Sequence, residues 1–185
     1  MKTVTAIVEQ KKDKKRVNVY LDGEFCCGMD LFTVMSERIK VGTEIDEKRL
    51  EEVVAMSEYS SALDKALGYI SKTMRTKVQL ITYLKGKNYD GKTIAKVIDK
   101  LFEYGYVDDE LYAKRFAAEK KLSKGKRAIA YELRIKGVDE KTIDKVMDEA
   151  AEEDEGCMRV AVKYLKGREL DFETRGKCYR YLLSK

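Results

Sequence analysis

The sequence predicts a mainly helical protein, with tandem three-helix repeats in an elongated curved array and a small N-terminal β-meander. Two observations predict this. Apolar residues recur with period two before about residue 30 and with period 3.6 after it. In addition, Leu84–Asp99 and Leu133–Asp148 match without a gap at an offset of 49 residues, with 9 of 16 positions identical. A repeat of this length is typical of stacked helical units, because one unit cannot bury its apolar stripe alone.

Residues 1–29 are expected to form three strands. Val4–Val8 is short and β-branched, and Arg16–Leu21 alternates so that its apolar residues share one face. Asp22-Gly23 is a strong two-residue hairpin signal before a third strand at Glu24–Cys26. A meander of this size is too small to fold alone. We therefore expect it to pack against helices.

Helices follow from about residue 30. Thr43-x-x-Asp46 is typical of a helix start with Thr43 as the cap, and the residues after it mark one apolar face. In the first repeat we expect helices over 60–70, 75–86 and 90–104. The expected domains are 1–57 (meander plus helices), 58–106 (repeat 1), 107–155 (repeat 2) and 156–185 (partial repeat 3). The third copy stops before its last helix, so we expect a truncated chain.

Composition excludes several kinds of site. The chain has no histidine, so the commonest general base and metal ligand is missing. The four cysteines form no CxxC pair, and adjacent Cys26 and Cys27 on a strand are expected to face opposite ways. We expect reduced, half-buried thiols, no metal and no cofactor. No apolar run is long enough to cross a membrane and the start lacks a signal-peptide core, so we expect a cytoplasmic protein.

Residues 86–93 fit the pattern GxxxxGK[ST] of a phosphate-binding loop. In such a loop Lys92 would reach the phosphates and Thr93 would hold magnesium. The context favours a turn between helices instead. The residues before the motif have helical spacing, and the second copy of the turn lacks the glycine before its lysine. We therefore expect Asp90, and Asp139 in the second copy, to cap the next helix.

Two other groups of residues have structural interpretations. Asp108-Asp109-Glu110 is expected to start a helix, with Asp108 as its cap, rather than to bind a metal. The serines have no histidine partner for nucleophile activation. Six of the 12 tyrosines of the chain mostly fall on or beside apolar stripes, and we expect them to pack in the core and between units rather than to stack on bases. They are Tyr59, Tyr69, Tyr83, Tyr104, Tyr106 and Tyr112.

Positive charge gathers on the helical repeats. Residues 71–87 hold five basic side chains and no acid, and residues 114–136 hold nine against two acids. An acidic run over 148–155 offsets them in the net charge of +5. Such surfaces bind phosphates or acidic protein grooves in a salt-dependent way. The candidate residues of this basic face are Arg75, Lys77, Lys85, Lys114, Arg115, Lys121, Lys124, Lys126, Arg127, Arg134 and Lys136.

Two strings of residues resemble a known family. One runs from Ala62-Leu63 through Tyr83-Leu84 to Gly105-Tyr106-Val107-Asp108-Asp109-Glu110-x-Tyr112-Ala113. The other combines Lys124-Gly125, Glu132-Leu133 and Lys136-Gly137-Val138. Both resemble the bacterial RecX family, strongly over about 57–150, whereas the β segment resembles extensions of some members only.

The resemblance implies an all-helical array that regulates the recombinase RecA without being an enzyme. It implies binding in the groove of the RecA–single-stranded-DNA filament, where it limits strand exchange, ATP hydrolysis and co-protease activity in DNA repair and recombination. We expect a monomer that meets acidic groups of RecA, with phosphate contacts to single-stranded DNA as a possibility. Two alternatives stay open: a stand-alone nucleic-acid-binding protein that contacts the phosphate backbone, and a nucleotide hydrolase that uses the loop at 86–93.

Overall fold

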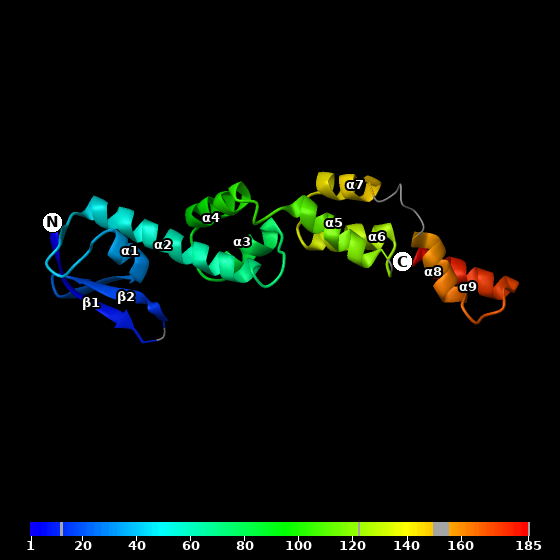
Figure 1. The fold of residues 1–185 in the computed structure, drawn as a ribbon, viewed down its shortest axis with the longest axis horizontal. Coiled ribbons are helices and arrows are strands. Elements are labelled where there is room, and N and C mark those ends of the chain that lie inside the picture. The colour runs from blue at the N-terminus through cyan, green and yellow to red at the C-terminus, as the bar shows by residue number, and fades with distance from the viewer. Residues whose placement is uncertain (12, 122, 150–155, 185) are drawn as a thin grey trace. The chain divides into compact units, whose positions relative to one another are not determined.

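The computed structural model describes residues 1–11, 13–121, 123–149 and 156–184 (Figure 1). The chain divides into two compact units, and each is described by itself. The first comprises Met1–Thr73 and Ile81–Glu103. The second comprises Met74–Leu80 and Tyr104–Lys185. Within the described residues the structure is mainly helical with a small N-terminal antiparallel sheet, as the sequence predicts.

The N-terminal sheet consists of β1 (Lys2–Gln10), β2 (Asp13–Leu21), β3 (Glu24–Asp30) and β4 (Glu44–Ile45), in the order β3-β2-β1-β4. The predicted hairpin turn is present: Asp22 and Gly23 have φ angles of 49° and 87°, as a tight turn between twisted strands requires. The short β4 pairs with the start of β1 and was not predicted. Two residues carry too little periodicity to reveal a strand.

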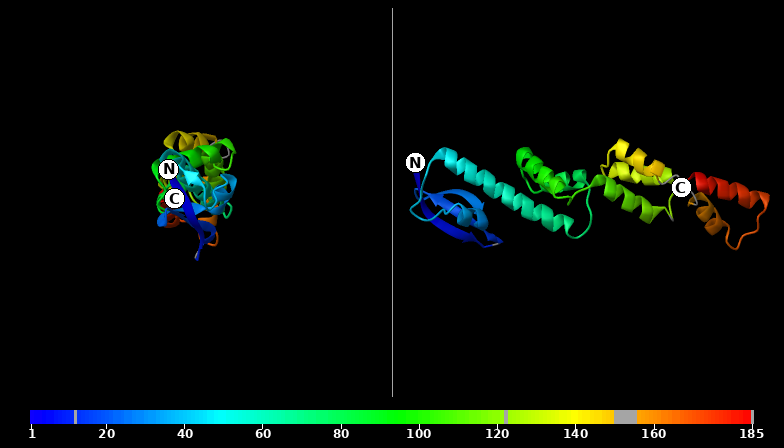
Figure 2. Two further views of the ribbon diagram at one scale, coloured as in Figure 1. Left: turned by 90° about the vertical axis from the view of Figure 1, so that its left-hand side faces the viewer. Right: turned by 45° about the horizontal axis from the view of Figure 1, so that its top comes forward.

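The core of this unit lies between the sheet and two helices. Val17, Val19 and Leu21 are buried on one face of β2, as the alternation predicts. Against them pack α1 (Leu31–Ser36) and the long α2 (Glu47–Ile70), and Val53 of α2 is fully buried in the same cluster. Figure 2 shows α2 running beside the sheet and continuing past it. The small sheet thus gains the helical partner that it needs.

The start of α2 corrects one prediction. Asp46, not Thr43, is the N-cap, and its carboxylate accepts a hydrogen bond of 2.7 Å from the Arg49 amide. The Thr43 hydroxyl instead accepts from the amide of Lys40 in the preceding turn. Pairing of residues 44 and 45 with β1 holds this segment extended. The helix therefore begins three residues later than the capping pattern indicated.

The two adjacent cysteines correct another prediction. Cys26 and Cys27 do not divide between the two faces of the sheet, because both pack against the same core. The reason is an irregularity in β3: Val19 pairs with Cys27, whereas the next residue, Tyr20, pairs with Phe25. A bulge of this kind breaks the alternation of side chains. Burial, followed by the neighbouring Cys26, raises the pKa of the Cys27 thiol to about 12, so it stays protonated.

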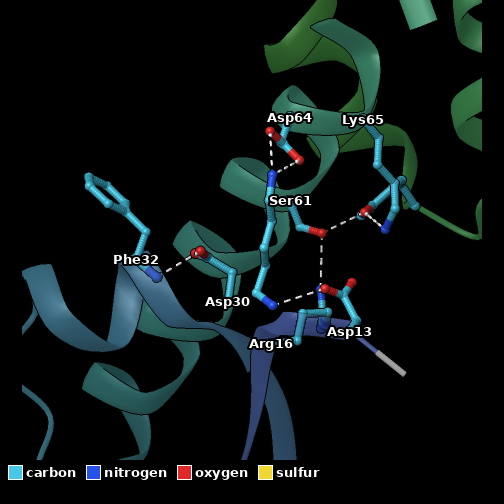
Figure 3. Close-up of polar contacts among 9 residues, drawn as sticks. Asp13, Arg16, Asp30, Phe32, Ser61, Asp64 and Lys65 are labelled. Atoms are coloured by element: carbon cyan, nitrogen blue, oxygen red, sulfur yellow. Dashed lines mark hydrogen bonds and ion pairs between the residues drawn. The ribbon is translucent and has the colours of Figure 1, made fainter. Parts of the chain in front are cut away.

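Polar contacts tie the sheet to α2 and to the turn before α4 (Figure 3). Arg16 of β2 donates to the Ser61 hydroxyl at 3.0 Å, and Ser61 lies 2.8 Å from the hydroxyl of Tyr89. Lys65 donates to the same tyrosine oxygen at 2.9 Å. The ring of Phe32 on α1 points away from these contacts. The network fixes the sheet on the middle of α2.

The rest of the first unit is helical. α2 is continuous through residues 57 and 58, and it packs against α4 (Gly91–Glu103). α3 (Lys77–Lys85) comes between them in the sequence; its part from Ile81 onward belongs to this unit, and its Leu84 is fully buried. The rings of Tyr69 and Tyr83 stack with centroids 4.1 Å apart, which fits the predicted packing role. The domain limits of the sequence analysis stay a prediction.

The second unit contains α5 (Asp109–Lys120), α6 (Lys126–Ile135) and α7 (Glu140–Glu149). α6 and α7 begin at Lys126 and Glu140, 49 residues after the starts of α3 and α4, so the helices recur as the sequence repeat predicts. Their core includes Leu133 and Ile143, both fully buried. Leu133 occupies the position of Leu84 in the first copy.

The segment Met74–Leu80 belongs to this unit and docks on the turn between α6 and α7. The Thr76 hydroxyl donates to the Lys136 carbonyl at 2.6 Å, and the Lys77 amide donates to the Asp109 carboxylate at 2.8 Å. Gly137 has φ +83°, and a Cβ there would lie 2.4 Å from that of Val78. Glycine is therefore required at position 137 for two reasons: the positive φ angle and the close approach of Val78.

The unit also holds α8 (Gly156–Leu165) and α9 (Phe172–Leu183), which pack on each other. Tyr164 and Tyr181 stack with centroids 4.7 Å apart, and Cys178 is buried. The side chain of Cys157 and residues 150–155, most of the acidic run, lie outside the described part.

Two tyrosines do not pack as predicted. Tyr104 and Tyr106 are 60% and 61% exposed, although they were expected to pack in the core or between units. They flank Gly105, whose φ of +68° turns the chain between α4 and α5. The helical period that suggested packing therefore ends before them, and their rings meet edge to face at 6.2 Å.

Candidate partner-binding surface

The loop that fits the phosphate-binding pattern is a capped helix start. Asp90 accepts hydrogen bonds from the amides of Lys92 and Thr93, at 2.7 and 3.0 Å. The Thr93 hydroxyl also donates to Asp90, at 2.6 Å, and these hydrogen bonds lower the pKa of that carboxyl. A carboxylate thus occupies amides that a phosphate would need. The residues before the loop lie in α3, as their spacing predicts, rather than in a buried strand.

The acidic cluster before α5 is also a helix start. Asp108 is the N-cap of α5 and accepts from the Leu111 amide at 2.9 Å, as predicted. Asp109 binds the Lys77 amide, and burial raises the pKa of its carboxyl. Asp139 caps α7 in the way that Asp90 caps α4, with its carboxylate bound to Thr142. Across the described residues, no group of three or more cysteine and acidic side chains could hold a metal ion.

Three of the predicted basic residues are neutralised by acids of their own unit. Lys114 contacts Glu110 at 2.8 Å and Glu149 at 3.0 Å. Arg134 forms two contacts with the carboxylate of Glu140, one of them from Nε at 2.9 Å. Lys124 is paired with Glu132. Each of these pairs costs free energy to break, so these cations are poorly placed to attract a partner.

Glu110 is the centre of the strongest of these clusters. Lys114 and Lys145 both donate to its carboxylate at 2.8 Å and lower its pKa to about 2. The same contact with Glu110, followed by that with Glu149, raises the pKa of Lys114. The cluster joins α5 to α7 across the helix pair. From the sequence alone, Lys114 could not be distinguished from basic residues that have no acidic partner.

Others of the predicted set lie against neighbouring side chains. Arg115 donates to the Met74 sulfur at 3.3 Å, and the Lys136 ammonium lies 5.2 Å from the centre of the Phe116 ring. Arg75 is half-buried near Tyr112. Burial raises the pKa of the Tyr112 hydroxyl, and the charge of Arg75 offsets part of that rise. Lys77 and Lys121 are exposed at helix ends. These residues keep charge at the surface of the second unit.

Lys126 and Arg127 stand out on α6. Both are exposed, and among the described residues no acid pairs with either one. Lys85 is also exposed but belongs to the first unit. The second unit holds the other ten. Their part in binding stays a prediction.

Two further exposed residues of the same helix are absent from the predicted set. Tyr131 is 60% exposed and Ile135 is 67% exposed, on the side of α6 opposite the buried Ile129 and Leu133. Their offsets of four and eight residues from Arg127 place all three on one face. The signal was available in the sequence, since both lie off the apolar stripe. We define Arg127, Tyr131 and Ile135 as the α6 outer face; the exposed Lys126 lies at the first residue of the helix, outside this face.

None of the described helices combines the length and the apolar character that crossing a bilayer requires. The N-terminal sheet, the recurring three-helix bundles and the capped helix starts define a helical-repeat protein. The comparisons with known proteins agree. The model of the Regulatory protein RecX N-terminal domain matches residues 2–46, and those of the first and second RecX three-helix domains match 62–101 and 108–147. The chain belongs to the RecX family of regulatory proteins.

Individual relatives support the same conclusion. The Regulatory protein RecX of Clostridium beijerinckii is 35% identical over 100% of this chain and 90% of its own length. That of Bacillus subtilis is 30% identical over 90% of this chain and 63% of its own length. A crystal structure of a regulatory protein RecX matches with a TM-score of 0.70 at 25% identity, over 100% of this chain and 93% of the other. The structure of RecX from Lactobacillus salivarius shares the fold, with a TM-score of 0.64 at 22% identity over 69% and 87% of the two chains.

Proposed function

We propose that this protein binds the groove of the RecA–single-stranded-DNA filament and inhibits its recombinase, ATPase and co-protease activities, in DNA repair and recombination. The observation that carries the proposal is the match to RecX regulatory proteins along the whole chain. In this proposal the protein acts through its surface rather than as an enzyme. It works in the cytoplasm as a monomer, with RecA as its partner.

The exposed cations of the second unit support a role in this binding. Lys126 and Arg127 present charge that the protein does not neutralise itself within its described part. Such charge accelerates the encounter with an acidic partner and makes it depend on salt. Exposed cations of this kind also suit the alternative of a stand-alone nucleic-acid-binding protein. The proposed filament regulator should bind the filament more tightly than bare DNA, whereas a stand-alone nucleic-acid-binding protein should bind both equally well.

The test is ATP hydrolysis by RecA on single-stranded DNA with this protein titrated in. We expect inhibition well below one copy per RecA, because a protein that acts on a filament affects many subunits. A control without RecA should show no turnover. Turnover in that control, abolished by Lys92→Ala, would indicate a nucleotide hydrolase. No effect on RecA, with equal affinity for bare DNA, would favour the nucleic-acid-binding alternative.

A further inference from the structure

The outer face of α6 combines charge with apolar surface. Arg127, Tyr131 and Ile135 follow one another at intervals of four residues along the helix. At 100° per residue they fall within about 80° of arc, and they extend over about 12 Å. The buried side of the same helix, at Ile129 and Leu133, is fixed in the core of the second unit. The outer face is therefore presented on a rigid element.

The apolar part of this face consists of two large, exposed side chains. Tyr131 and Ile135 are 60% and 67% exposed, and no aromatic ring contact involves Tyr131 among the described residues. Next to them, Arg134 is held by Glu140 and Lys136 lies over Phe116. Arg134 and Lys136, the sequence neighbours of Ile135, are therefore already engaged in contacts within the protein. Scattered apolar residues are normal on a surface, but an aromatic and an aliphatic residue one turn apart beside unneutralised cations are typical of interfaces.

We propose that the α6 outer face is a protein-docking face that fits an apolar pocket bordered by carboxylates on a RecA subunit of the filament. This assignment rests on the proposed function and names the chemistry of its partner. Arg127 would meet the carboxylates, with the exposed Lys126 flanking the face at the start of the helix, while Tyr131 and Ile135 would fill the pocket in the manner of a helix in a groove. Residues 124–136 hold five basic side chains and one acid, which fits an acidic partner.

The composition of the face favours protein over nucleic acid. A phosphate backbone offers Ile135 no apolar surface, so burying this side chain against DNA would return little free energy. Tyrosine and arginine, in contrast, are the residues that most often dominate protein interfaces. Tyr131 could stack on a base, and contact with the single-stranded DNA of the filament is therefore the outcome that the experiment must separate.

The experiment compares two probes: a filament of RecA on labelled single-stranded DNA with a slowly hydrolysed ATP analogue, and the same labelled DNA without RecA. The full-length protein is titrated into each as wild type, Tyr131→Ala, Ile135→Ala and the double variant. Alanine favours helix, so α6 should persist, which circular dichroism would verify. Tyr179→Ala and Val162→Ala serve as matched controls, because these side chains are 65% and 62% exposed on α9 and α8.

We expect each single variant to weaken filament binding by about 10-fold and the double variant by more, as for the central residues of an interface. Binding to bare DNA and the control variants should be unchanged. Undiminished filament binding by the double variant, while the wild type binds, would overturn the α6 assignment alone. An equal loss on bare DNA would replace the protein pocket with a nucleic-acid contact. A wild type that does not bind the filament at all would overturn the proposed function and the assignment with it.

Discussion

Acidic side chains determine which lysines of the second unit are already held in ion pairs. Glu110 holds Lys114 and Lys145 on α5 and α7, and Glu132 holds Lys124. At the start of α6 the described residues supply no such acid, so Lys126 and Arg127 keep their charge available. At the scale of single residues, the difference between a paired cation and an available one is thus the position of one carboxylate.

The pKa of Glu110 predicts how this cluster depends on pH. Its value is about 2 in the folded protein against 4.5 for the free side chain. Because the folded state lowers the pKa, the cluster stabilises the protein fully above about pH 4.5 and loses this contribution as the pH falls toward 2. In Glu110→Gln, the loss of thermal stability relative to wild type should be present at pH 7 and vanish near pH 2. Melting curves across this range measure it.

The control for this prediction is Glu169→Gln, an exposed carboxylate between α8 and α9, which should leave the pH profile unchanged. Salt at about 1 M should shrink the effect of Glu110→Gln, because exposed ion pairs are screened within a few ångströms at that concentration. A pH-independent difference between Glu110→Gln and wild type would contradict the ion-pair explanation.

At the scale of helices, the two copies of the repeat use the same apolar positions. Leu84 lies in the last turn of α3 and Leu133 at the equivalent place in α6, and both are fully buried. Thr76, Lys77 and Val78, at the start of α3, contact Lys136, Asp109 and Gly137. The equivalent residues of α6 include Lys126 and Arg127, which are exposed. The start of this helix therefore packs against the second copy in α3, whereas in α6 it faces solvent.

We predict that Leu84→Ala and Leu133→Ala each destabilise the protein by about 2–5 kcal/mol, the cost of removing a buried leucine and leaving a cavity. Urea unfolding followed by circular dichroism would measure this. The matched change Leu170→Ala, at a side chain that is 59% exposed, should cost less than about 0.5 kcal/mol. A loss below about 1 kcal/mol in either core variant would mean that the repeat does not bury that position.

At the scale of the whole molecule, the helical unit occurs more than once in the described chain, whereas the sheet occurs once. The sheet is bound to α2 through Arg16, Ser61 and Tyr89, and α2 itself passes from the sheet to the first three-helix bundle. One continuous helix thus belongs to both parts. The basic face is concentrated in the second unit, which holds the uncompensated charge of α6.

We predict that Lys126→Glu combined with Arg127→Glu slows association with the RecA filament and flattens its salt dependence, while the fold stays intact. The reason is that exposed charges act mainly on the encounter rate. Stopped-flow association at several salt concentrations would measure both effects. Lys11→Glu with Lys14→Glu makes the same charge change on the exposed β1–β2 hairpin and should have little effect. Unchanged association in the α6 variant would remove these two residues from the binding surface.

The sequence by itself determined the helical repeat, the β-meander, the aspartate caps and the family. These follow from local periodicity and capping, which are properties of neighbouring residues. Tertiary structure decided the rest. The pairing of β4 displaced the cap from Thr43 to Asp46, the bulge in β3 turned both cysteines to the core, and the turn at Gly105 exposed Tyr104 and Tyr106. It also decided which cations are neutralised, because an ion pair depends on distances between helices that periodicity does not encode.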